Sequence, residues 1–137
     1  MSVTELHYDT VSEARAHFSA LIDAAEAGVP ATVRRDRRRS AVVDADRLRH
    51  FLVGVRPARA EVVAEGGGWS IMLPGLPIAA DGETFEEAVD EMVAALREYA
   101  EDWANHLRHA SNHEQNWGLV QIIDLSSDEE LRDWLQR

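Results

Sequence analysis

Apolar residues recur at helical spacing in two long stretches of the chain. In residues 11–25 they form one stripe that includes Phe18, and the Gly28 and Pro30 that follow are typical of a helix end. In residues 85–107 the same period continues for about six turns at 3.6 residues per turn. Each stretch is preceded directly by a Thr, with a Glu three residues after that Thr, a spacing that satisfies the free amides of a first turn. The pattern predicts two amphipathic helices, and the second is the longest expected element.

Short alternating or β-branched runs predict strands elsewhere. We expect a strand at residues 3–8, and a hairpin in which residues 31–34 and 40–43 are joined by an Arg-rich segment. A second hairpin is expected from strands at 61–64 and 69–73 around the glycines at 66–68, because apolar and polar residues alternate after them. The remaining expected elements are strands at 78–80 and 119–125, a turn at 81–82, a short helix capped by Asp44 or Asp46, and a last helix from Ser127. Segregated strands and helices indicate the α+β fold class.

Residues 53–59 contain Gly54 and Pro57, have no clear period, and separate two halves of unlike charge. Residues 1–59 carry 10 Arg against 8 Asp and Glu, a balance of +2, whereas residues 60–137 carry 4 Arg against 17 Asp and Glu, a balance of −13. We therefore expect a domain at 1–52, a linker at 53–59 and a domain at 60–137. Because domains of about 60 to 80 residues bury little core alone, dimerisation is also expected.

Composition narrows the class of protein further. The chain has no Cys, which excludes disulfides and thiolate metal sites. No stretch approaches the roughly 20 apolar residues that a membrane span needs, and the N-terminus has no basic-then-apolar signal pattern. From this composition we expect a soluble cytoplasmic protein with no membrane partner.

Arginines are concentrated in the first predicted hairpin. Like charges crowded into one turn repel each other, and contact with phosphates would relieve that repulsion. Arg15 lies beside the apolar stripe of the first predicted helix and could add a positioning contact. DNA would be repelled by the acidic half, so only the first half is a candidate nucleic-acid surface. The alternative interpretation is a solvated hairpin tip. The hairpin arginines are Arg34, Arg35, Arg37, Arg38 and Arg39.

Two sequence patterns partly match ligand-binding motifs, one for phosphate and one for a metal ion, but each lacks residues that its motif requires. The glycines at 66–68 have neither the Lys nor the Ser or Thr of a P-loop. His106, His109 and His113 are spaced three and four residues apart, as metal ligands on one helix face would be. Ser111 and Asn112, however, are expected to end the helix before His113, and no HExxH pattern occurs. We therefore expect no metal and no cofactor.

The carboxylates of the long predicted helix fall mostly opposite its apolar stripe. This arrangement indicates a solvated face, or else an acidic docking surface for a basic protein. A two-metal nuclease needs acidic side chains from several strands in one pocket, and no G-x-S-x-G nucleophile pattern occurs. We therefore expect no catalytic residues. The helix carboxylates are Glu86, Glu87, Asp90, Glu91, Glu98, Glu101 and Asp102.

Roughly the first 52 residues resemble the Phd/YefM, or prevent-host-death, antitoxins. The resemblance rests on Thr10-Val11-Ser12-Glu13-Ala14-Arg15, on Phe18 and Leu21, and on the predicted hairpin and short helix that follow. It implies a small α/β module that dimerises, binds operator DNA and represses its own operon. It also implies DNA contacts by an Arg in the S-E-A-R segment and by one at the end of the strand entering the hairpin, here Arg15 and Arg35. The other hairpin arginines are added on electrostatic grounds.

The second half resembles HicB-like antitoxin domains. The matching residues are Trp69-Ser70-Ile71-Met72-Leu73-Pro74-Gly75-Leu76-Pro77, then Asp81-Gly82-Glu83-Thr84-Phe85-Glu86-Glu87-Ala88, then the long helix. The resemblance implies a partial RNase H-like β-β-β-α-β fold, an antiparallel sheet with one long helix, that is catalytically inert and covers a toxin. Ile78-Ala79 differs from the Gly-Cys that often follows Leu-Pro in that family.

Taken together, these resemblances predict a type II antitoxin that binds a basic toxin and represses its own operon as a homodimer or higher even oligomer. RelE/ParE-like toxins accompany the first family and HicA-like ribonucleases the second, so the toxin class stays open, as do the residues that contact it. Two other classes also stay open. One is a divergent RNase H-like, metal-dependent nuclease, and the other is an acidic protein-interaction module that binds no DNA.

Overall fold

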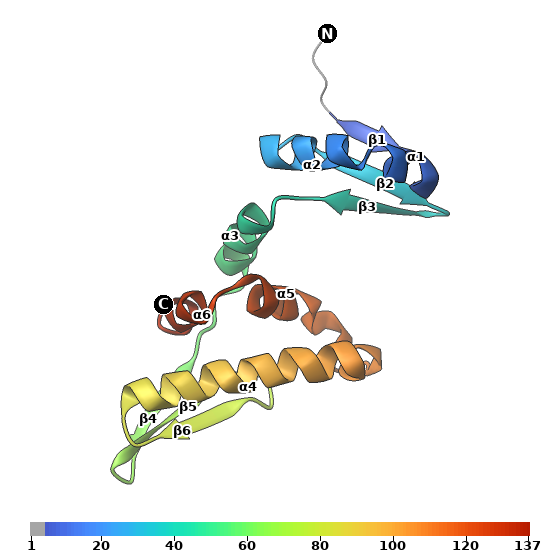
Figure 1. Cartoon of the computed structure of the whole chain (residues 1–137). Helices are drawn as coiled ribbons and strands as arrows, with labels where there is room; N and C mark the ends of the chain where they lie inside the picture. The colour runs from blue at the N-terminus through green and yellow to red at the C-terminus, as the bar shows by residue number, and fades with distance from the viewer. Residues whose placement is uncertain (1–4) are drawn as a thin grey trace. The chain divides into compact units, whose positions relative to one another are not determined.

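The computed structural model describes residues 5–137 and divides the chain into two compact units (Figure 1). Unit 1 is Met1–Leu48 and unit 2 is Arg49–Arg137. Helix α3 (Ala45–Val55) contains the point of division, and its first turn is capped by Asp44, which accepts a hydrogen bond of 3.1 Å from the Arg47 amide. α3 includes residues 53–55, the first three of the predicted linker, because Val53 is buried and a single Gly54 does not end a helix.

Unit 1 contains a three-stranded mixed sheet. Its strands are β1 (Leu6–Tyr8), β2 (Ala31–Arg35) and β3 (Arg38–Val42), in the order β1-β2-β3. β1 runs parallel to β2, and β2 runs antiparallel to β3. The predicted basic hairpin is confirmed, and its turn is shorter than expected, with only Asp36 and Arg37 between the strands. The predicted first strand is confirmed at residues 6–8, while residues 3 and 4 lie outside the described residues.

Two helices, α1 (Val11–Ala16) and α2 (Phe18–Ala27), pack against one face of this sheet. Thr10 caps α1 as predicted, accepting a hydrogen bond of 3.1 Å from the Glu13 amide. The prediction of one continuous helix is wrong, because the chain breaks at His17 (φ −124°), whose ring stacks on Tyr8. Because of this break, the side chains of α2 do not continue the helical spacing of α1. Phe18 is consequently 57% exposed and does not join the apolar core of Ala14, Leu21 and Ala31.

Unit 2 contains an antiparallel sheet in the order β4-β5-β6. β4 (Glu61–Glu65) and β5 (Gly68–Met72) form the predicted second hairpin, and β6 is Ala79–Gly82. The turn predicted at 81–82 is instead the end of β6, which pairs with Ser70 and Trp69. A side chain at Gly82 would collide with the backbone at the start of the next helix. The absence of a side chain at this position therefore lets the helix begin directly against the sheet.

The long predicted helix is confirmed as α4 (Phe85–Asn105) and covers one face of this sheet. Thr84 caps it, accepting a hydrogen bond of 3.1 Å from the Glu87 amide. Trp69 meets Phe85 edge-to-face at 5.7 Å between ring centroids, and Ile71 is almost fully buried. α4 ends two residues before the predicted Leu107, which begins a 3₁₀ turn, η1 (Leu107–His109).

The strand predicted at 119–125 is wrong, because this segment is helix α5 (Trp117–Leu125). The run Leu-Val-Gln-Ile-Ile-Asp-Leu is short and mostly apolar, and so few residues do not distinguish a buried helix from a buried strand. In the structure Leu119, Ile122 and Ile123 are fully buried at the three- and four-residue spacing of a helix. The described part of unit 2 therefore lacks the final strand of the β-β-β-α-β order.

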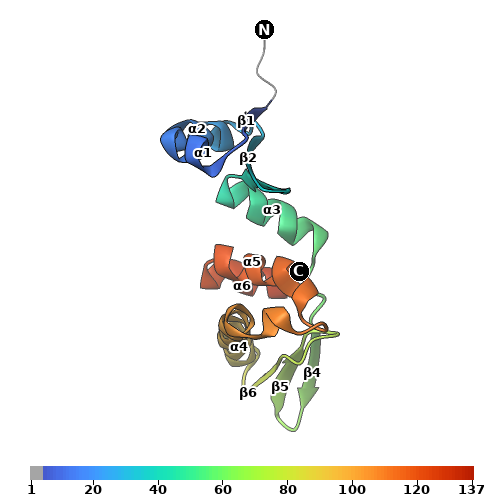
Figure 2. The same cartoon turned by 90° about the vertical axis from the view of Figure 1, so that its right-hand side faces the viewer.

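After η2 (Glu114–Asn116) and α5, Ser127 opens α6 (Asp128–Leu135) with the predicted capping box. Helices α5 and α6 both pack against α4, on its side opposite the sheet (Figures 1 and 2). Arg97 of α4 donates to the carbonyl oxygen of Ser126 at 2.8 Å and to the Asp128 carboxylate at 2.8 Å. One guanidinium thus joins α4 to the end of α5 and the start of α6. None of the described helices is long and apolar enough to cross a membrane.

Candidate functional site

The hairpin arginines project from both faces of the unit 1 sheet. The strand register places Arg34 opposite Arg39 and Arg35 opposite Arg38. Side chains alternate between the faces of a strand, and directly opposed residues share a face. The Arg34–Arg39 pair therefore projects from the open face, and the Arg35–Arg38 pair from the face that carries the helices. Arg37 lies in the turn.

Two carboxylates accompany the arginines of the open face. Arg34 Nε lies 3.8 Å from Asp9 Oδ1, and Arg39 Nη1 lies 3.8 Å from Glu5 Oε1. These separations exceed hydrogen-bonding distance and the side chains are well exposed, so each pair adds little stability. Their effect is electrostatic, because they offset the two positive charges on this face.

A hydrogen-bond network holds these carboxylates in place. The buried Thr32 hydroxyl donates to Glu5 Oε1 at 3.0 Å. His7 bridges the network, with Nδ1 2.7 Å from Thr32 Oγ1 and Nε2 2.9 Å from Asp9 Oδ1. Glu5 and Asp9 are consequently anchored beside the arginines. None of these four residues was predicted from the sequence, although the period-two spacing of Glu5, His7 and Asp9 indicates that they share one face of a strand.

The arginines of α1, of the hairpin turn and of the sheet face that carries the helices have no such partners among the described residues. Because β1 and β2 are parallel, their C-terminal ends lie at the same end of the sheet, where the hairpin turns. Helix α1 follows β1 and therefore lies at this end (Figure 1). Arg15 is on α1, next to the buried Ala14. Within residues 5–137 no carboxylate lies within 4.0 Å of Arg15, Arg35, Arg37 or Arg38. Four exposed cations without ion-pair partners therefore lie on α1 and the hairpin at one end of unit 1.

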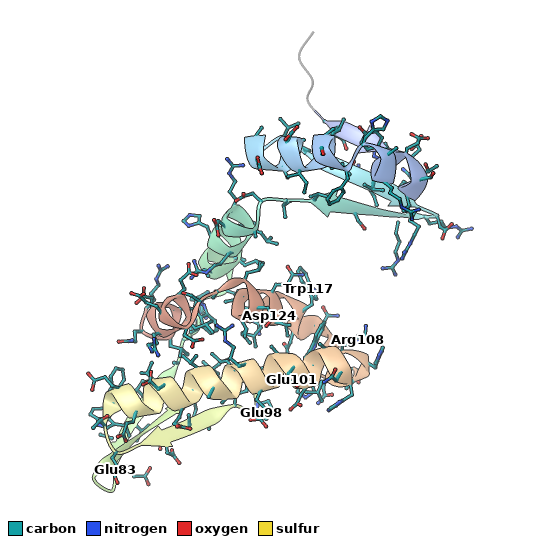
Figure 3. All side chains as sticks on the ribbon, in the orientation of Figure 1. Glu83, Glu98, Glu101, Arg108, Trp117 and Asp124 are labelled. Carbon is teal, nitrogen blue, oxygen red and sulfur yellow. The ribbon has the colours of Figure 1, made fainter. Side chains whose placement is uncertain are left out.

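Acidic side chains dominate the surface of α4 in unit 2. The sequence predicted a solvated face there, and all but one of the seven carboxylates are exposed, Asp102 being partly buried. Figure 3 shows Glu98 and Glu101 along this helix. The structure therefore confirms a solvated acidic face.

The three histidines after α4 do not form a metal site. His113 Nδ1 lies 2.8 Å from the Tyr99 hydroxyl, which also accepts a hydrogen bond of 2.8 Å from Asn116. The backbone oxygen of His113 accepts a hydrogen bond from the Trp103 indole. His113 thus joins the end of α4 to the 3₁₀ turns. In the described part of the chain no group of three or more His, Asp or Glu side chains could hold a metal ion.

A protein-family model described as "Antitoxin of toxin-antitoxin, RelE / RelB, TA system" matches residues 6–136. This chain belongs to that PHD-like antitoxin family. The match runs through both units, so one family describes nearly the whole chain, whereas the sequence patterns resemble a different family in each half. Membership implies a cognate toxin as the partner of this antitoxin.

A solved structure has the same fold as this antitoxin. It is the crystal structure, at 1.80 Å resolution, of the antitoxin part of a proposed toxin/antitoxin system from Syntrophomonas wolfei subsp. wolfei. The two chains are 22% identical, the superposition covers 96% of each, and the TM-score is 0.78. No curated protein matches the sequence. The structural match supports the α+β assignment over both units.

The capping box of α6 makes the stability of the folded antitoxin depend on pH. The Ser127 backbone amide donates to Glu130 Oε1 at 2.9 Å and lowers the pKa of that carboxyl, and Arg49, 3.0 Å away, lowers it further. A carboxyl whose pKa is lower in the folded chain stabilises the fold above its unfolded-state pKa, and this stabilisation is lost as pH falls through the folded value.

Glu130→Gln should therefore melt at a lower temperature than the wild type at neutral pH, and the difference should vanish in acid. Thermal melts from neutral pH to below the lowered Glu130 pKa will test this. A melting-temperature difference that stays constant across that range would contradict a role for the ionised carboxylate.

Proposed function

We propose that this antitoxin neutralises a basic protein toxin by direct binding through unit 2. Support comes from the charge of residues 60–137, which carry 17 carboxylates against 4 Arg. Complementary charge speeds association and selects the partner. RelE/ParE-like and HicA-like toxins both fit this chemistry, and the choice between them is part of the proposal's test.

Titration of the purified antitoxin with the product of the neighbouring reading frame tests this part of the proposal. We expect a complex whose association rate falls as salt is added, because exposed charges are screened at high ionic strength. The activity of the isolated toxin then identifies its class. A neighbouring product that forms no complex with the antitoxin at any salt concentration would refute the proposal.

We further propose that unit 1 dimerises and binds operator DNA, so that the antitoxin represses its own operon. The observation that carries this proposal is the group of four arginines on α1 and the hairpin that have no carboxylate partner in the described part of the chain. Two copies related by a two-fold axis would present two such groups to a palindromic site. A sedimentation mass near twice 15.3 kDa for the free protein is expected.

Arg15→Ala combined with Arg35→Ala should weaken operator binding without dissociating the dimer. Each lost phosphate contact removes about 0.9 from the slope of log affinity against log salt. Gel-shift titrations at several fixed salt concentrations measure both effects, and sedimentation checks the dimer. An unchanged titration curve would refute the assignment of these two arginines.

A further inference from the structure

Strand β4 lies at an edge of the unit 2 sheet. Among residues 5–137, the strand order β4-β5-β6 leaves one side of β4 without a neighbouring strand, and Figure 2 shows β4 at the outer border of this sheet. All five of its residues are exposed, including Val62 at 43% and Val63 at 47%. An edge of this kind presents unpaired backbone amides and carbonyls that can pair with another strand.

β4 lacks most of the features by which proteins block such pairing. Its register with β5 is continuous over five residue pairs, from Glu61↔Met72 to Glu65↔Gly68, without a bulge. The strand contains neither Pro nor Lys, two residues that commonly protect an edge. Its apolar centre, Val62-Val63-Ala64, is bounded by a glutamate at each end. The geometry therefore permits strand addition, and the charges restrict which strand can be added.

The two glutamates disfavour a second copy of this chain as the added strand. Glu61, Val63 and Glu65 project from the open face of the sheet, because Val62 is paired with Ile71, which is buried on the α4 side. An in-register antiparallel copy would place Glu61 opposite the partner's Glu65, and like charges directly opposed destabilise a sheet. Asp81 projects from the same open face through its pairing with Ser70.

We propose that β4 accepts an extended strand of the toxin that is apolar at its centre and basic at both ends, so that the toxin extends the unit 2 sheet. Basic residues opposite Glu61 and Glu65 would form cross-strand pairs on the open face, and backbone hydrogen bonds would supply affinity. This inference rests on the proposed function, and assigns the toxin-binding role within unit 2 to the β4 edge instead of the acidic face of α4.

A matched pair of charge reversals in the full chain tests the proposal. Glu61→Arg with Glu65→Arg should weaken binding of the neighbouring reading frame's product by roughly tenfold or more, because two attractive cross-strand pairs become repulsive. Glu98→Arg with Glu101→Arg makes the same change of charge on exposed residues of α4 and should have a much smaller effect. Calorimetric titrations at one salt concentration give both affinities, and circular dichroism checks that both variants fold.

The possible outcomes separate this inference from the proposed function. If the wild type binds no toxin, the proposed function fails. The β4 inference fails and the proposed function stands if the wild type binds the toxin and the β4 variant binds it as tightly as the wild type does. The same conclusion follows if the β4 variant loses no more affinity than the α4 variant. Hydrogen exchange gives a second readout, in which the toxin should slow exchange of the amides of residues 61–65. A change in sedimentation mass of the free β4 variant would show pairing with a second copy and overturn the inference.

Discussion

Replacing Arg35 and Arg38 with Ala will weaken operator binding more than replacing Arg34 and Arg39. Both double variants remove two arginines that face each other across the same hairpin, so they change the net charge equally. Arg34 and Arg39 lie 3.8 Å from Asp9 and Glu5, whereas Arg35 and Arg38 have no carboxylate within 4.0 Å in the described chain. The unpartnered pair is therefore the better phosphate ligand.

We expect Arg35→Ala with Arg38→Ala to weaken the free energy of operator binding by about 1–3 kcal/mol for each arginine that contacts a base edge. For each lost phosphate contact, the slope of log affinity against log salt should become shallower by about 1. Fluorescence anisotropy with an operator duplex measures both quantities, and the Arg34/Arg39 variant is the matched control. Equal losses in the two variants would show that Glu5 and Asp9 do not select the DNA-binding arginines.

Truncating Leu96 to Ala will produce a large loss of stability in unit 2. Leu96 is completely buried in the middle of α4, the helix that packs against the sheet on one side and against α5 and α6 on the other. Removing its branched end costs transfer free energy and leaves a cavity, which together lower the free energy of unfolding by about 3–5 kcal/mol. The exposed neighbouring substitution Glu98→Ala should change it by no more than about 0.5 kcal/mol.

Tryptophan fluorescence during urea denaturation measures this effect in unit 2 specifically. The four Trp residues, at 69, 103, 117 and 134, all lie in unit 2. Unfolding of unit 1 therefore contributes no tryptophan signal of its own. If Leu96→Ala and Glu98→Ala unfold at the same urea concentration, the claim that the Leu96 side chain is central to the packing of unit 2 is contradicted.

Features set by local chemistry were predictable from the sequence. Thr10, Thr84 and Ser127 each lie three residues before a Glu, and each caps a helix in the structure. The amphipathic period of α4 and the two predicted hairpins also appear in the structure. In these cases the interacting groups are close in sequence, so short-range patterns determine the structure.

Features that depend on distant residues were not predictable. The helix break at His17 coincides with stacking on Tyr8, and the helical state of residues 117–125 depends on burial against α4. The division of the arginines into two sets depends on Glu5 and Asp9, which approach the hairpin only when β1 pairs with β2. Sequence composition showed a cluster of cations, and the fold was needed to show which of them lack carboxylate partners.

The most direct test of the account is growth of cells that express the toxin from the neighbouring reading frame. Co-expression of the wild-type antitoxin should restore growth, and so should a variant with Arg15, Arg35, Arg37 and Arg38 all replaced by Ala, because toxin binding is assigned to unit 2. Failure of the wild type to restore growth would contradict the antitoxin function. Failure of the arginine variant alone, at equal protein levels, would contradict the assignment of DNA binding and toxin binding to different units.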